Sequence, residues 1–238
     1  MGTSTTPVAS SLAGIETRYV GITHNLANVS TTGFKRVRTS FSQALREAGA
    51  AGGGGVAADT HVDFTQGPLQ GTGRPLDLAI TGKGFFVLET PKGPLYTRNG
   101  TFTTNAEGNL VDTQGRLVAG EGGPIVVPTT VSPSQVAVGA DGTVLAAGQA
   151  IGKLRVVEFA DRAALRPEGA SGFRAPAGVQ PRAAGKFAVT QGHLEGSNVN
   201  VAEELVGLIT ATRLYESNLK GVGATDERLK NLLQVAMA

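Results

Sequence analysis

The sequence predicts an α+β protein, in which helices at the two ends of the chain pair in a coiled-coil-like domain around a central antiparallel all-β domain. Apolar residues recur near both ends at alternating spacings of three and four, which is the heptad pattern of a helix with a narrow apolar seam. The middle of the chain instead carries short alternating apolar runs separated by turn-forming residues. The 34 glycines among 238 residues also favour short strands and turns over a helical bundle.

The first helix is predicted over residues 8–30. Its narrow apolar seam would contain Leu12, Ile15, Tyr19, Ile22, Leu26 and Val29. We expect the helix to end near Asn28, because a run of turn-forming residues follows. Asn25 and Asn28 can bond backbone groups at a helix end. Gly33 permits a positive φ after the helix, and Phe34 can then anchor the returning chain.

Between the helical ends we expect a glycine-rich linker at 46–60 and then a β domain at 61–192. The β domain is predicted from period-two alternation and hairpin turn signals at short intervals. Phe85 and Phe86 belong to a short apolar strand and are expected in its core. Residues 163–190 are rich in proline, glycine and alanine and give little strand signal.

The helical spacing returns from Val201 and continues for about five heptads. This second seam would contain Leu205, Leu208, Thr212, Tyr215, Leu219, Val222, Asp226, Leu229, Leu233 and Ala236. Asn198 or Asn200 can cap the start of the helix. Glu203 and Glu204 lie in its first turn, where the helix dipole favours negative charge.

Composition argues against several kinds of function. The absence of cysteine excludes disulfides, thiolate metal sites and cysteine nucleophiles. The net charge is +2, and the densest basic stretch, 35–38, is too short for a nucleic-acid-binding stripe. No run approaches the roughly 20 apolar residues of a membrane helix, and no secretory signal is visible. The three histidines are scattered and no nucleophile motif occurs, so we expect no catalytic, cofactor-binding or metal site and no enzymatic activity.

Several blocks of the sequence resemble the flagellar rod and hook protein family. Residues 24–36 contain Asn-Leu-Ala-Asn and then Thr-Thr-Gly-Phe-Lys-Arg, which looks like that family's N-terminal signature. Residues 67–86 are similar to the start of the family's β domain, and 96–102 and 105–111 continue the similarity. Residues 194–204 resemble the family's lead into its C-terminal axial helix. The resemblance therefore spans nearly the whole chain.

The resemblance implies a structural subunit of the bacterial flagellar basal-body rod. Its terminal helices would polymerise helically with copies of itself and with other flagellar rod proteins, forming the periplasm-spanning drive shaft. The flagellar type III export apparatus would deliver it without a cleaved signal peptide. Residues 121–128 and 194–198 favour a proximal rod subunit, with a distal rod or hook-type axial subunit as the alternative. No nucleic-acid partner and no membrane insertion are expected.

The implied domains are an N-terminal axial helix and turn at 1–45, the linker at 46–60, a β-rich outer domain at 61–192 and a C-terminal axial helix at 193–238. The predicted subunit-interface residues are Leu12, Ile15, Tyr19, Ile22, Leu26, Asn28, Gly33, Phe34, Leu205, Leu208, Tyr215, Leu219, Val222, Leu229 and Leu233. Two other interpretations remain open. The helices could pack only within one monomer, or the chain could be a secreted β-rich binding module.

Overall fold

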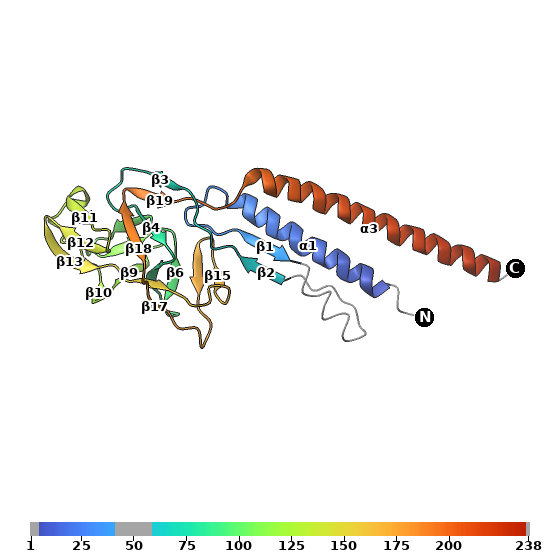
Figure 1. The fold of residues 1–238 in the computed structure, drawn as a ribbon, viewed down its shortest axis with the longest axis horizontal. Helices are drawn as coiled ribbons and strands as arrows, with labels where there is room; N and C mark the ends of the chain where they lie inside the picture. The colour runs from blue at the N-terminus through green and yellow to red at the C-terminus, as the bar shows by residue number, and fades with distance from the viewer. Residues whose placement is uncertain (1–4, 41–58, 237–238) are drawn as a thin grey trace. The chain divides into compact units, whose positions relative to one another are not determined.

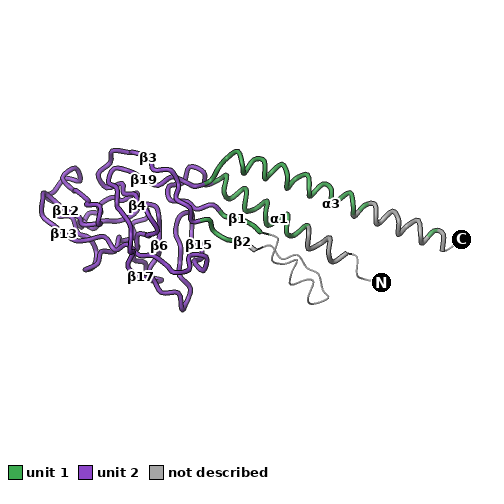
Figure 2. Tube along the Cα trace, viewed as in Figure 1, with its two compact units in different colours: residues 1–27, 37–63, 199–238 green, residues 28–36, 64–198 purple. Residues whose placement is uncertain are grey.

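The computed structural model describes residues 5–40 and 59–236 (Figure 1). The chain forms two compact units (Figure 2). Unit 1 contains residues 1–27, 37–63 and 199–238, and unit 2 contains residues 28–36 and 64–198. Most of the predicted linker at 46–60 lies outside the described residues, so the predicted domain boundaries stay a prediction.

Unit 1 combines two helices with a two-stranded ribbon. Its elements are α1 (Thr5–Ala27), α3 (Val201–Ala236), β1 (Val37–Ser40) and β2 (Asp59–Val62). α1 and α3 lie side by side, and β1 pairs antiparallel with β2 and packs on α1 (Figure 1). The cap of α3 is Asn200, whose Oδ1 accepts the backbone N–H of Ala202 at 3.0 Å and of Glu203 at 3.4 Å.

The predicted coiled-coil-like pairing of the two helices is wrong, because α3 faces α1 with small residues. Ala211 is buried and shares a pocket with Ile15 of α1. A Cβ added at Gly207 would lie 3.3 Å from Cδ1 of Ile22. Glu204, buried and three residues before Gly207, lies on the same face of α3. This face allows a close approach of the two backbones.

The predicted apolar seam of α3 lies on another side of the helix. Leu205, Tyr215 and Leu219 are each more than 40% exposed, so they do not interlock with α1 as knobs in holes. At 3.6 residues per turn, Leu205 and Leu219 point roughly 80 to 120° away from Ala211 around the helix axis. The heptad spacing identified an apolar stripe correctly, but the contact within this monomer uses the neighbouring stripe of small residues.

Unit 2 is built on a large sheet, which has ten strands in the described part of the chain. Its main path is β15–β16–β6–β5–β9–β8–β7, with β10 beside β9 and with β14 pairing both β5 and β17. The strands are β5 (Phe85–Glu89), β6 (Leu95–Thr97), β7 (Phe102–Thr104), β8 (Leu110–Asp112), β9 (Leu117–Gly120), β10 (Gly123–Pro124), β14 (Val156–Glu158), β15 (Arg166–Glu168), β16 (Gly172–Arg174) and β17 (Arg182–Ala183).

Smaller sheets complete unit 2. β11, β12 and β13 form a three-stranded sheet, β4 pairs with β18, and β3 pairs with β19. Their bounds are β3 (Leu69–Gly71), β4 (Leu78–Gly82), β11 (Val136–Val138), β12 (Thr143–Ala146), β13 (Gln149–Lys153), β18 (Phe187–Gln191) and β19 (His193–Glu195), with a 3-10 turn η1 (Pro133–Gln135) before β11. The strand pairs described here are antiparallel, so the α+β class and the antiparallel β domain are confirmed.

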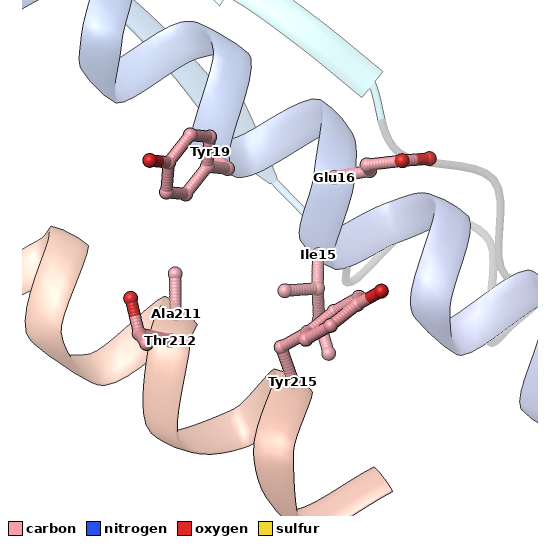
Figure 3. A pocket seen from close by; sticks show the side chains of 6 residues that line it. All are labelled: Ile15, Glu16, Tyr19, Ala211, Thr212 and Tyr215. Atoms are coloured by element: carbon pink, nitrogen blue, oxygen red, sulfur yellow. The ribbon is translucent and has the colours of Figure 1, made fainter. Parts of the chain in front are cut away.

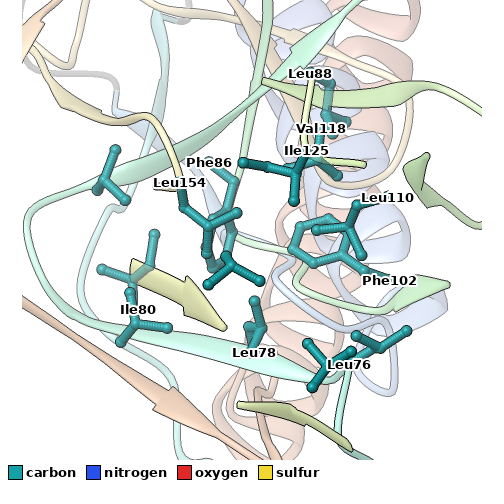
Figure 4. Packing of buried hydrophobic residues seen from close by; sticks show 14 of the residues in the cluster. Leu76, Leu78, Ile80, Phe86, Leu88, Phe102, Leu110, Val118, Ile125 and Leu154 are labelled. Atoms are coloured by element: carbon teal, nitrogen blue, oxygen red, sulfur yellow. The ribbon is translucent and has the colours of Figure 1, made fainter. Parts of the chain in front are cut away.

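The core of unit 2 forms around β5 (Figure 4). Phe85 and Phe86 are both fully buried, as predicted, and successive strand residues point to opposite faces. The Phe86 ring packs edge-on against Phe102, with centroids 5.1 Å apart, while Phe85 contacts Phe64 and Phe173. Burying each such ring contributes about 1.5–3 kcal/mol, which explains why this strand is apolar on both faces.

Candidate functional site

Four of the sequence blocks that resemble the rod family meet in unit 2, around the carboxylate of Glu195. Lys35 Nζ donates to Glu195 Oε1 at 2.5 Å, and Arg98 Nη1 donates to Oε2 at 3.2 Å. The backbone N–H of Gly67 also donates to Oε1, at 3.1 Å. The side chains of Lys35 and Glu195 are fully buried, and that of Arg98 is 3% exposed. The ion cluster is therefore almost completely removed from water.

Backbone contacts join the same segments. Gly33, whose φ is +69° as its position in the turn predicts, donates its N–H to the carbonyl of Glu195 at 2.7 Å. The backbone N–H of Arg36 donates to Asn198 Oδ1 at 2.7 Å, and Asn198 Nδ2 donates to the carbonyl of Thr65 at 3.1 Å. We call Gly33, Lys35, Arg98, Glu195 and Asn198 the motif junction. It fastens the segment after α1 to the segment before α3.

The electrostatics of the motif junction depend on Glu195, because two cations share its one carboxylate. Arg98 also donates to the carbonyls of Ile80 and Gly82, and its guanidinium carbon lies 5.2 Å from the centroid of the Phe85 ring. Burial lowers the pKa of Arg98, and Glu195 acts in the opposite direction. Removing the carboxylate from such a desolvated cluster is destabilising, because it leaves buried charge uncompensated.

Lys35, Arg98 and Glu195 lie within the sequence blocks that resemble the rod family, but no ion pair among them is predicted from the sequence. No local signal sets these residues apart: Lys35 lies in the basic stretch 35–38, and Arg98 and Glu195 lie among polar and small residues. Charged residues are rarely buried unless they are paired. Their pairing was not predictable because Lys35 and Glu195 are 160 positions apart in the sequence.

The interface residues predicted on the first helix are distributed over several levels of burial in unit 1. Ile15 and Ile22 are buried, Leu12 and Leu26 are half-buried, and Tyr19 is exposed. The first four contribute to the interior of this unit, which leaves Tyr19 accessible at its surface. Contact of these residues with other subunits stays a prediction.

Three further predicted interface residues follow α1 and belong to unit 2. Asn28 is half-buried, and its carbonyl accepts the backbone N–H of Thr31 at 3.1 Å in the turn after the helix. Gly33 and Phe34 are buried. Their part in subunit contacts stays a prediction.

The predicted interface residues of α3 are mostly accessible where their side chains are described. Leu205, Tyr215 and Leu219 are exposed, and Leu208 is half-buried. The other three lie on the part of α3 whose side chains are outside the description: Val222, Leu229 and Leu233. Tyr215 and Ile15 line the same pocket between α1 and α3.

Asn25 closes the end of α1 onto the returning strand β1. Its Nδ2 donates to the carbonyl of Val37 at 2.8 Å, and its Oδ1 accepts the N–H of Val37 at 2.8 Å. Asn25 is 1% exposed, so these two bonds replace water for both backbone groups. A bond from Asn25 to a backbone group at the helix end is predicted from the sequence, and its partner in the structure is Val37 of β1.

Replacing Asn25 with alanine should destabilise unit 1 by about 1–3 kcal/mol, because two backbone groups of Val37 lose their partners. Hydrogen exchange at the Val37 amide would measure this loss as faster exchange. Thr23→Ala is the control, since that exposed hydroxyl bonds only carbonyls of its own helix, and it should change stability by less than about 0.5 kcal/mol. Equal exchange rates in the two variants would contradict the assigned role of Asn25.

Neither described helix has the length and apolar character needed to cross a membrane. Within residues 5–40 and 59–236, histidines and carboxylates do not gather in groups of three or more that could hold a metal ion. The side chains of the motif junction hold chain segments together through ion pairs and hydrogen bonds.

Comparison with known proteins agrees with this arrangement. The family described as flagellar hook protein FlgE/F/G D1 domain matches residues 79–146. The family described as flagellar basal body rod FlgEFG protein C-terminal matches residues 190–235, which include β19 and almost all of α3. The two matches thus cover part of the β-rich unit and the second helix.

Similar curated proteins extend the match over almost the entire chain. The flagellar basal-body rod protein FlgG of Buchnera aphidicola subsp. Schizaphis graminum is 35% identical, covering 90% of this chain and 92% of that protein. FlgF of Caulobacter vibrioides is 35% identical over 90% and 89%, and FlgG of Bacillus subtilis is 34% identical over 95% and 96%. The chain therefore belongs to the flagellar basal-body rod protein family and is a structural component of the rod.

Proposed function

We propose that this rod subunit polymerises helically through its terminal helices, with copies of itself and with other rod proteins. The observation that carries the proposal is the set of exposed large apolar residues on α3: Val201, Leu205, Val206, Ile209, Leu214, Tyr215 and Leu219. Apolar surface left in water on this scale is typical of a protein–protein contact. Unit 2 has its own buried core, so it does not need these residues to fold.

Repetition of such a contact explains how a rod forms. If one side of unit 1 binds a different side of the next copy, the contact is heterologous, and it produces a helical tube when the rotation does not close. Each added copy buries the apolar residues of α3. In this proposal residues 1–45 and 193–238 form the assembling part, 46–60 links it, and 61–192 forms the outer domain.

Three finer points belong to the same proposal. The flagellar type III export apparatus delivers the chain, as the resemblance of residues 24–36 to the family signature implies. The subunit occupies the proximal rod. The amino-acid sequence of residues 121–128 and 194–198 favours this position over the distal rod or a hook-type position. Its role is structural and not enzymatic, in keeping with relatives that are named as rod proteins.

The test is Leu205→Asp in the full chain. Leu205 is 46% exposed, so the variant should fold, whereas a charge at the buried Ile22 would also disturb unit 1. We expect loss of the variant from isolated basal bodies and loss of motility, because a carboxylate would be buried in the subunit contact.

The matched control is Gln149→Asp, which places the same charge at an exposed polar position on β13 of unit 2. It should incorporate normally. Normal incorporation of Leu205→Asp would reject assembly through the exposed apolar residues of α3. The secreted binding module would then become the better interpretation.

A further inference from the structure

A pocket of about 230 Å³ opens between α1 and α3 within unit 1 (Figure 3). Its lining residues are Ile15, Glu16, Tyr19, Ala211, Thr212 and Tyr215. The small side chain of Ala211 leaves the space, and Tyr19 and Tyr215 border it on either side (Figure 3). Both tyrosines are more than 40% exposed, so the pocket is open to a side chain arriving from outside.

The same helix carries side chains that would fit this pocket, on a different side. Val206 and Ile209 are 64% and 54% exposed. With Arg213 they are spaced three and four apart, which places all three within about 60° of one another around the axis of α3. The centre of the pocket-lining residues of α3 lies roughly 140° away from them. A copy therefore cannot insert these side chains into its own pocket.

The pocket and the exposed side chains of α3 match in size and in charge. A cavity of about 150 Å³ accommodates a benzene molecule, so this pocket is large enough for a branched aliphatic side chain. Its apolar walls come from Ile15, Ala211 and the two tyrosine rings, and Glu16 lies at its edge with its carboxylate directed away from α3 (Figure 3). In the described part of the chain Glu16 and Arg213 make no ion pair. They are complementary charges, one beside the pocket and one beside the exposed aliphatic pair.

We propose that the pocket receives Val206 and Ile209 of a second copy of this chain, with Arg213 of that copy against Glu16. This inference rests on the proposed polymerisation and names the contact that carries it. Pocket and inserting side chains are different surfaces of the molecule, so the contact leaves a free pocket on one copy and a free aliphatic pair on the other. Addition of copies can continue in one direction without closing.

The chain contains no cysteine, which makes disulfide trapping a direct test. The variant carries Val206→Cys and Thr212→Cys in the full chain, expressed in its bacterium in place of the wild type. Within one copy these positions are about 9 Å apart along the helix, beyond the roughly 7 Å that a disulfide can span. Oxidation of isolated basal bodies should give a ladder of linked multimers, at least tenfold above a Val206→Cys, Ser217→Cys control.

Charge reversal is an independent test of the pocket contact. Glu16→Arg and Arg213→Glu should each lower incorporation into basal bodies about fivefold, by placing like charges together. The double variant should recover most of the loss, since the pair is restored with exchanged signs.

The outcomes separate the two proposals. If the variants are present in basal bodies but the cysteine pair gives no more multimers than its control, the pocket contact is wrong and rod assembly stands. Linkage of Thr212→Cys to a different protein would also reject a second copy as the occupant. Absence of even the wild-type chain from basal bodies would overturn the proposed polymerisation and the pocket contact together.

Discussion

Replacing Glu195 with alanine is expected to lower the free energy of unfolding of unit 2 by about 3–5 kcal/mol, because removing one partner of a buried ion cluster leaves uncompensated charge. Lys35 and Arg98 would lose their shared carboxylate, and the N–H of Gly67 would lose its acceptor. Hydrogen exchange at the amides of β5 and β9 reports this loss, since these inner strands of the large sheet exchange mainly by global opening of the unit.

Two matched variants identify the cause. Glu121 pairs with Lys153 at 3.4 Å and is 58% exposed at its side chain, so Glu121→Ala should cost less than about 1 kcal/mol. Lys35→Met should cost less than Glu195→Ala, because one cation and one carboxylate would remain as a balanced pair. A loss from Glu195→Ala no larger than that from Glu121→Ala would show that the motif junction does not stabilise unit 2.

The sequence predicted features that depend on neighbouring residues. Gly33 follows a run of turn formers and has φ +69°. Phe85 and Phe86 lie in an apolar strand bounded by turns, and both are fully buried. These features were predictable because turn chemistry and strand burial are largely set within a few residues.

Contacts between distant segments were not predictable in this way. Glu195 contacts Lys35 and Arg98 only after the chain has folded. The spacing of these residues along the sequence does not indicate that they form an ion cluster. β15 and β16 form a hairpin inside 163–190, where proline and glycine hid the strand signal, because pairing within the large sheet overrides weak local propensity.

The choice of helix face is a third case. The heptad stripe of α3 is real, but Gly207 and Ala211 lie on the neighbouring stripe and permit the closer contact with α1. The pattern of large apolar residues therefore identified the apolar stripe of α3 correctly. It did not identify the face of α3 that contacts α1. Leu205 and Leu219 of this stripe remain exposed in the monomer, so they are available for subunit contacts in the proposed rod.

Gly33→Ala is expected to destabilise unit 2 by about 3 kcal/mol, combining roughly 1–2 kcal/mol for a side chain at positive φ with about 1–3 kcal/mol for overpacking. An added Cβ would lie 2.3 Å from the backbone nitrogen of Asn99 and 2.6 Å from the carbonyl carbon of Arg98. Backbone atoms cannot move aside as a flexible side chain would. The shift required would also pull on Glu195, whose carbonyl accepts the Gly33 N–H at 2.7 Å.

Gly73→Ala separates these two contributions. Gly73 has φ +70°, almost the same as Gly33, but a Cβ there would meet no atom within 4 Å. Urea unfolding should therefore show a loss of only about 1–2 kcal/mol for Gly73→Ala, the cost of the left-handed conformation alone. The excess at Gly33 then measures how tightly the turn after α1 is pressed against the segment carrying Arg98. Equal losses for the two variants would mean that this segment yields, and that the turn is held by its hydrogen bonds and not by close packing.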